Sequence, residues 1–232
     1  MKTVKTKEQL KSELVPMRAQ GLSIGFVPTM GALHSGHTEL MRIARGENPV
    51  VVASIFVNPT QFNNPNDLRN YPRTLDQDLK KCNEAGVDFV FVPDVEEIYP
   101  EPDHRLFDFG NLDKVMEGKF RPGHFNGVAQ VVSKLFDAVG PTRAYFGQKD
   151  FQQLAIIRRM VNDLFYNIDI VACPTVREED GLAMSSRNML LNAQQRASAP
   201  LIAKTLFEAR NKASELNVEQ TINWVVNNIN RD

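Results

Sequence analysis

The sequence has few of the features that mark extracellular, metal-binding or membrane proteins. Its two cysteines, Cys82 and Cys173, lie far apart and form no CxxC pair, which argues against a disulfide framework or a zinc site. No apolar run approaches about 18 residues, and the polar start of the chain, MKTVKTKEQLKSEL, has no signal-peptide core. We therefore expect a cytoplasmic protein with both thiols reduced and buried.

An excess of one charge is also missing, because 27 Lys and Arg residues balance 28 Asp and Glu residues to a net charge of -1. This balance removes the usual electrostatic reason to expect a nucleic-acid partner, but it allows small anionic substrates. The two common phosphate-binding fingerprints, GxxxxGK[ST] and GxGxxG, are absent as well. If the chain binds a nucleotide, it holds the phosphates in another way.

What the sequence does contain is an alternation of short apolar runs and amphipathic segments. The apolar runs predict strands at residues 23–27, 50–57, 88–92, 143–146 and 168–172. The segments between them predict helices at residues 39–45, 75–85, 128–139 and 151–165. Such alternation indicates an α/β fold with a doubly wound, Rossmann-like parallel sheet.

The pattern changes near Pro174. A polar loop follows, and then two amphipathic helices are predicted at about residues 193–216 and 218–228. We therefore predict a first domain of residues 1–174, which would bind the substrates, and a smaller C-terminal domain of residues 175–232.

The first candidate site is PTMGALHSGH, residues 28–37, where the first strand ends and the first helix begins. Ligands of α/β sheets bind at such positions. Gly31 and Gly36 let the backbone approach a ligand, and a helix N-terminus attracts phosphate. His34 and His37 lie one helical turn apart, so both can donate hydrogen bonds to charge that develops on one phosphate group. Metal binding is disfavoured, because zinc motifs of this kind need histidines at i and i+4 with a glutamate between them.

The second candidate site is Met184-Ser185-Ser186-Arg187-Asn188, in the polar loop after the boundary. An arginine fork and two hydroxyl groups suit a phosphate clamp. An ordinary polar loop has the same composition, so the argument depends on this motif occurring together with the two histidines.

These motifs carry a family resemblance. PTMGALHSGH resembles the HxGH signature, and MSSRN resembles the degenerate KMSKS loop, of the nucleotidyltransferase superfamily that includes class I aminoacyl-tRNA synthetases. Three further blocks resemble the pantothenate synthetase family specifically: FVNPTQF (56–62), FGQKDFQQL (146–154) and PTVRE (174–178). The resemblance extends from about Phe26 to Leu191.

The resemblance implies a ligase that uses ATP to convert pantoate to a pantoyl-adenylate, releases pyrophosphate, and then transfers the pantoyl group to β-alanine with release of AMP. It also implies a homodimer. We expect Mg²⁺ carried by the ATP phosphates, because it neutralises triphosphate charge. The balanced charge and the lack of long apolar runs lead us to expect no nucleic-acid or membrane partner. Family members usually continue past the last two helices with further strands. The resemblance therefore implies a shortened C-terminal domain, and we expect its closure over the nucleotide to be incomplete.

The resemblance also assigns roles to individual residues. It assigns pantoate binding to Asn58, Gln61 and Gln153. It assigns ATP binding to Met30, Gly147, Lys149, Asp150, Val176, Met184, Ser185, Ser186 and Arg187. It assigns stabilisation of the departing pyrophosphate, and hence catalysis, to His34, His37, Lys149, Ser186 and Arg187.

Plainer interpretations of some of these residues stay open. Gln61 could be a solvated turn residue, and Lys149 with Asp150 could form a surface ion pair. Arg121, in FRPGHF, could face the active site or make a loop or dimer contact.

Two other functions also stay open at this point. One is a nucleotidyltransferase that moves AMP or CMP to a phosphate-bearing acceptor. Its acceptor pocket should be basic, whereas the candidates here are Asn58, Gln61 and Gln153. The other is a binding protein that kept the fold and lost activity, which the net charge of -1 disfavours for a nucleic-acid partner.

Overall fold

The computed structural model describes residues 1–230, and these form two compact units that divide between Pro174 and Thr175. Asp232, the predicted end of the second domain, lies outside the described residues. Among the described helices, none combines the length and the hydropathy needed to span a bilayer.

The first unit is built on a six-stranded sheet in the order β1-β4-β3-β2-β5-β6, with every neighbouring pair parallel. The strands are β1 (Lys2–Val4), β2 (Ile24–Thr29), β3 (Val50–Ile55), β4 (Phe89–Phe91), β5 (Arg143–Gly147) and β6 (Asp169–Cys173). The five predicted strands are confirmed to within about two residues at each end. The sequence did not predict β1, which pairs with β4 at the edge of the sheet.

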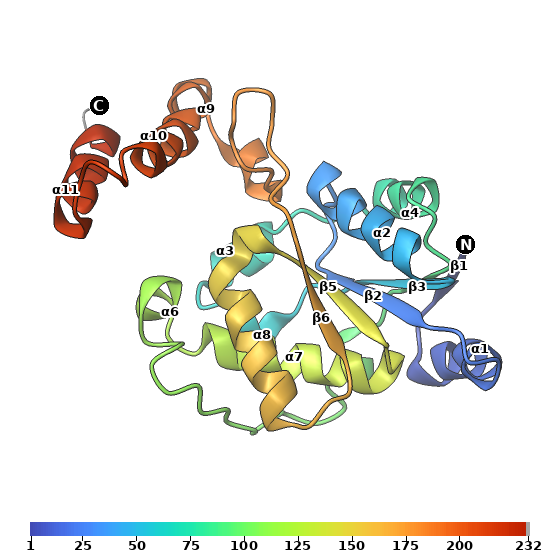
Figure 1. Ribbon diagram of the computed structural model, residues 1–232. Helices are drawn as coiled ribbons and strands as arrows, with labels where there is room; N and C mark the ends of the chain where they lie inside the picture. The colour runs from blue at the N-terminus through green and yellow to red at the C-terminus, as the bar shows by residue number, and fades with distance from the viewer. Residues whose placement is uncertain (231–232) are drawn as a thin grey trace. The chain divides into compact units, whose positions relative to one another are not determined.

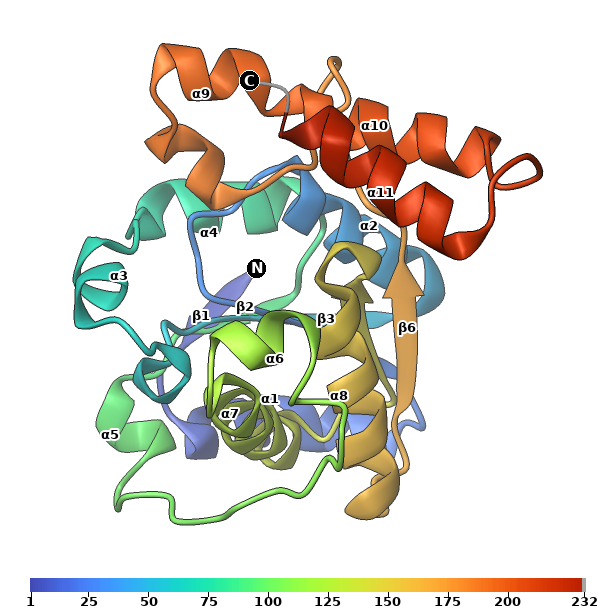
Figure 2. The same ribbon diagram turned by 90° about the vertical axis from the view of Figure 1, so that its left-hand side faces the viewer.

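Helices cover both faces of this sheet (Figures 1 and 2). One face carries α1 (Lys7–Ala19), α7 (His124–Val139) and α8 (Phe151–Asp163), and the other carries α2 (Ser35–Glu47) and α4 (Leu75–Glu84). Successive strand residues alternate between the two cores: Phe26 packs on the α7 side and Val27 on the α2 side. Because side chains on both faces of a strand are buried, apolar residues occupy successive positions, and the strands appear in the sequence as continuous apolar runs.

Shorter helices connect these elements. They are α3 (Pro65–Asn70), α5 (Val95–Ile98), α6 (Met116–Phe120) and the 3₁₀ helices η1 (Pro59–Gln61) and η2 (Gln148–Asp150). Cys82 and Cys173 are buried free thiols, as predicted. Burial raises the pKa of Cys82 to about 12 and that of Cys173 to about 11, so both stay protonated.

The chain reverses its direction of winding between β2 and β5. From β2 it proceeds to β3 and β4 on one side, and it later returns to add β5 and β6 on the other. In doubly wound sheets, the crevice for a ligand opens at the carboxyl ends of the strands on either side of this switch point. Those ends are Thr29 and Gly147, and the segments that follow them contain the first candidate motif and Lys149.

The described part of the second unit, residues 175–230, consists of a polar hairpin and four helices: η3 (Ser186–Leu190), α9 (Ala193–Ser198), α10 (Pro200–Asn211) and α11 (Val218–Ile229). The prediction of one helix over residues 193–216 is wrong. It is divided before Pro200, which has no N–H to continue the hydrogen-bond ladder of α9. α10 and α11 lie side by side (Figures 1 and 2).

Candidate active site

The loop between β2 and α2 has its shape fixed by a carboxylate on a neighbouring helix. Asp78, a buried residue of α4, accepts the N–H of Ala32 (2.9 Å) and that of Leu33 (2.8 Å). These bonds hold Ala32 at a φ of 47°, which a residue with a side chain rarely adopts. Gly31, at φ +80°, approaches so closely that an added Cβ would lie 3.0 Å from Asp78 Oδ2. The loop therefore needs both the glycine and the carboxylate.

His34 and His37 cap α2 with their own side chains. Nδ1 of His34 accepts the N–H of Gly36 (3.1 Å), and Nδ1 of His37 accepts the N–H of His34 (3.3 Å). A ring nitrogen that accepts cannot carry a proton, so the hydrogen of each neutral ring lies on Nε2. The ring centroids are 4.1 Å apart. Two Nε2–H donors are thereby brought together at the N-terminus of a helix, where the helix dipole favours an anion.

The electrostatic surroundings keep His37 neutral. Burial, followed by the charges of His34, Lys149 and Lys81, lowers the pKa of His37 from 6.5 to about 3. Lys149 follows β5, so its effect on His37 ties the ends of β2 and β5 into one site. Near pH 7, His37 is therefore a neutral hydrogen-bond donor, and the positive charges of Lys149 and Lys81 act on it.

Gln61 lies in the same site and is buried, so its interpretation as a solvated turn residue is wrong. Its Nε2 donates to Sδ of Met30 (3.0 Å), four residues before His34. Its Oε1 accepts from Nδ2 of Asn58 (3.1 Å), which also donates to the carbonyl of Gly127 (3.1 Å). Met30, Asn58 and Gln61, predicted as site residues, are therefore in direct contact.

The backbone of η1 rests closely on the start of α7. An added Cβ on Gly127 would lie 2.5 Å from the carbonyl oxygen of Thr60 and 2.9 Å from Cα of Gln61, so a glycine is required there. The carbonyl of Gln61 is 2.8 Å from Nδ1 of His124 and accepts from Arg121 at 3.3 Å. Arg121 thus makes a loop contact, one of its two open interpretations, and it supports the backbone of Gln61.

The end of β5 is less enclosed. Lys149 and Asp150 are exposed, with Nζ 3.7 Å from Oδ1, so the surface ion pair foreseen as an alternative does form. Gln153 is partly buried on α8. Its neighbour Gln152, which the sequence did not single out, is buried and donates to the carbonyls of Leu112 (2.6 Å) and Val115 (2.8 Å).

In the second unit, the predicted nucleotide residues fall on a hairpin and the 3₁₀ helix after it. The N–H of Met184 donates to the carbonyl of Val176 (3.0 Å), so these two residues lie opposite each other. Ser185 caps η3 by accepting the N–H of Arg187 (3.3 Å). Ion pairs tie the hairpin to α9, because Arg196 contacts both Glu178 and Asp180 at 2.6 Å.

Sequence reasoning missed several residues that shape the site, including Asp78, His124 and Tyr99, whose hydroxyl donates to Oδ1 of Asn58 (2.9 Å). A signal for Asp78 was present, because it shares the helix face of Leu75, Leu79 and Cys82. A carboxylate on an apolar helix face must be matched by donors from elsewhere in the fold. The contacts of Tyr99 and His124 join distant parts of the chain and leave no comparable pattern.

Comparison with known proteins is consistent across sequence and structure. The family model described as pantoate-beta-alanine ligase matches residues 2–232. The pantothenate synthetase of Bacteroides thetaiotaomicron is 58% identical over 95% of this chain and 78% of its own length. That of Porphyromonas gingivalis strain W83 is 54% identical over 99% of this chain and 82% of its own length.

Two solved structures have the same fold. Pantothenate synthetase from Thermus thermophilus superposes with a TM-score of 0.94 at 47% identity, covering 100% of this chain and 83% of its own. Pantoate-beta-alanine ligase from Francisella tularensis, complexed with beta-gamma ATP and beta-alanine, superposes with a TM-score of 0.87 at 41% identity, covering 98% of this chain and 86% of its own. The site geometry, the family model and these relatives lead to one conclusion: the chain belongs to the pantoate–β-alanine ligase family.

Proposed function

We propose that this ligase works in two steps through a pantoyl-adenylate. A carboxylate oxygen of pantoate attacks the α-phosphorus of ATP, and pyrophosphate leaves. The amine of β-alanine then attacks the acyl carbon, the bond from that carbon to the AMP oxygen breaks, and AMP leaves with the electron pair while the nitrogen loses a proton. The observation that carries the proposal is the pair of Nε2–H donors on His34 and His37 in the same site as the Gln61 amide.

The two histidines would act on the phosphates. Charge grows on the bridging oxygen and on pyrophosphate as the α-phosphorus is attacked, and donors already in place stabilise it without reorganising. Because His37 is held neutral, it donates without the desolvation that a buried imidazolium would suffer. Lys149 supplies the permanent positive charge nearby, and Gly147 and Asp150 would hold the nucleotide, the carboxylate of Asp150 accepting from its ribose.

The amides would bind pantoate. Gln61 and Gln153 donate to its hydroxyl or carboxylate oxygens, and Asn58 shapes the same pocket. Neutral amides orient a carboxylate and leave it nucleophilic, whereas a cation in direct contact would hold its electron pair more tightly. Gln61 is buried, and its amide bonds to Asn58 and Met30, which supports this role.

The second unit would supply further nucleotide contacts. Val176 and Met184 are proposed for the adenine, and Ser185, Ser186 and Arg187 for the phosphates. The pairing of Val176 with Met184 across the hairpin supports a joint role for those two residues. Hydroxyl groups and a guanidinium in series are the donors that phosphate oxygens accept best.

Magnesium is proposed to arrive with ATP. The ion would be held by the phosphate oxygens of ATP and by water. Bound there, it would neutralise part of the triphosphate charge. By family resemblance we also propose a homodimer, and we propose a cytoplasmic location.

Exchange of labelled pyrophosphate into ATP tests the first step alone. Without β-alanine the second step cannot occur, and attack of labelled pyrophosphate on the adenylate re-forms ATP, so exchange should appear when pantoate is added and should not require β-alanine. Exchange that needs β-alanine, or that occurs without pantoate, would contradict the proposed order of events.

A further inference from the structure

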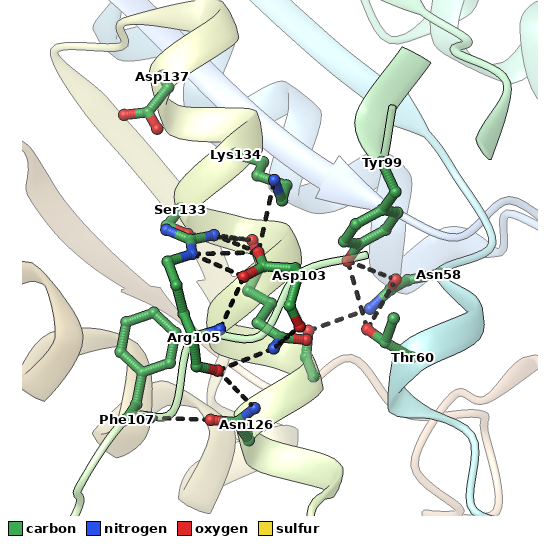
Figure 3. A network of polar contacts seen from close by, with 12 residues as sticks. Asn58, Thr60, Tyr99, Asp103, Arg105, Phe107, Asn126, Ser133, Lys134 and Asp137 are labelled. Carbon is green, nitrogen blue, oxygen red and sulfur yellow. Dashed lines mark hydrogen bonds and ion pairs between the residues drawn. The ribbon is translucent and has the colours of Figure 1, made fainter. Parts of the chain in front are cut away.

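We propose that Tyr99 is a positioning residue for pantoate, because its hydroxyl group stabilises the orientation of the Asn58 amide and, through it, that of the Gln61 amide. The inference rests on the proposed function, in which Gln61 donates to pantoate. Tyr99 lies directly after α5, and its hydroxyl points at Asn58 and Thr60 (Figure 3).

The orientation of Asn58 follows from the polarity of its partners. A backbone carbonyl can only accept, so the Asn58 NH₂ group must face the carbonyl of Gly127, at 3.1 Å. Its Oδ1 then faces the opposite side, where it accepts from the hydroxyls of Tyr99 (2.9 Å) and Thr60 (3.1 Å). A reversed amide would set two acceptors against each other at Gly127. The carbonyl of Gly127 thus selects this orientation, and the two hydroxyls stabilise it by donating to Oδ1.

The orientation of Asn58 decides that of Gln61. Nδ2 of Asn58 also donates to Oε1 of Gln61 (3.1 Å), so the Gln61 NH₂ group faces away from Asn58. One of its hydrogens goes to Sδ of Met30 (3.0 Å), and the geometry leaves the second for a ligand oxygen. A reversed Gln61 amide would present lone pairs to a carboxylate and repel it.

Packing holds the Tyr99 ring in place for this task. The ring lies 6.4 Å from that of Phe56, and Nζ of Lys134 lies 5.3 Å from its centroid. Lys134 is itself paired with Asp103 (3.4 Å), which also binds Arg105 (Figure 3). Burial raises the pKa of Tyr99, so the hydroxyl keeps the proton that it donates.

Tyr99→Phe tests the proposal, because it keeps the ring and removes only the hydroxyl. The KM for pantoate in pyrophosphate exchange should rise roughly three- to tenfold, the effect of losing one hydrogen bond. The KM for ATP and the melting temperature should stay nearly unchanged. Tyr166→Phe is the matched control. It also removes a partly buried hydroxyl that packs on α7, but one that donates to Asp137 (2.6 Å), so the KM for pantoate should not change.

A double-mutant test with Gln61 distinguishes a positioning role of Tyr99 from a general structural role. In a Gln61→Leu background, Tyr99→Phe should have no further effect on the Kd of pantoate measured by calorimetry, because no amide is left to orient. Thr60→Val, which removes the second donor, should behave in the same way as Tyr99→Phe. The inference is wrong if Tyr99→Phe changes the KM for pantoate less than twofold, raises the KM for ATP equally, or acts by the same factor in both backgrounds. A wild-type protein without pantoate-dependent exchange would instead overturn the proposed function, and this inference with it.

Discussion

The imidazole rings of His34 and His37 lie with their centroids 4.1 Å apart at the start of α2, and each turns Nδ1 toward a backbone N–H. Nδ1 of each ring caps the helix, so the hydrogen of each neutral ring lies on Nε2. The helix cap and the proposed phosphate donors are therefore the same two side chains, and the fold that forms the helix also fixes which tautomer each ring adopts.

Removing the imidazole of His37 should slow adenylation more than it weakens nucleotide binding. We expect His37→Ala to lower the rate of pantoyl-adenylate formation by roughly two to three orders of magnitude, the usual effect of losing one preorganised transition-state donor. The Kd of ATP should change less. Rapid-quench kinetics measures the rate, and His104→Ala, at an exposed position, is the control. A folded His37→Ala protein with an unchanged rate would show that His37 has another role.

The lowered pKa of His37 makes folding stability depend on pH. Its pKa is about 3 in the folded protein against 6.5 ordinarily, so below pH 6.5 the unfolded chain binds a proton that the folded chain does not. This contribution to stability is complete above pH 6.5 and is lost as the pH falls toward 3.

We expect the free energy of unfolding to lose up to about 2 kcal/mol between pH 8 and pH 5 through this residue. Denaturant titrations of the wild type and His37→Gln at both pH values measure it. The variant should lose less stability than the wild type over this interval by about that amount, and identical losses would refute the assignment.

Asp78 is expected to matter for catalysis although it is proposed to touch no substrate. In Asp78→Asn, one carboxylate acceptor becomes an NH₂ group facing the N–H of Ala32 or Leu33, which destabilises the fold by about 1–3 kcal/mol. The loop that leads to His34 should shift, and adenylation should slow at least tenfold. Asp76→Asn, an exposed change on the same helix, should do neither. If Asp78→Asn lost stability but kept the wild-type rate of adenylation, the conformation of the loop before His34 would not matter for catalysis.

Gly127→Ala tests whether η1 must lie directly on α7. The new methyl group would meet the backbone of Thr60 and Gln61, so we expect a loss of about 1–3 kcal/mol in stability and a rise in the KM for pantoate with little change for ATP. Gly46→Ala has open space around its Cβ and should leave both constants unchanged. If Gly127→Ala raised the KM for pantoate and the KM for ATP equally, the cause would be general unfolding and not a displacement of Gln61.

The main lines of the fold could be predicted because local patterns agree with the global architecture. Strands such as β3, buried on both faces, form apolar runs that are visible in sequence. β1 was missed because three residues carry no periodicity, and its place in the sheet depends on pairing with β4. The start of α2 was predicted too late, because histidine is not among the usual N-cap residues that mark such a boundary.

The site could be predicted only where sequence motifs identify it. The motif containing His34 and His37 and the block containing Gln61 are contiguous in sequence, and both contribute to the site that the structure forms. Tyr99 could not be predicted, because its significance lies in hydrogen bonds to Asn58 and Thr60, which the fold brings to it from a distant segment. Hydrogen-bond polarity of this kind is a property of tertiary structure and leaves no periodic trace.

The central claim is that the carboxylate of pantoate becomes bonded to the α-phosphorus of ATP. Its most direct test uses pantoate labelled with ¹⁸O at both carboxylate oxygens, with ATP and β-alanine, and mass spectrometry of the products. The account predicts one ¹⁸O atom in each AMP released and the other in the amide carbonyl of the product. AMP without ¹⁸O, with the label found in inorganic phosphate or pyrophosphate, would contradict it.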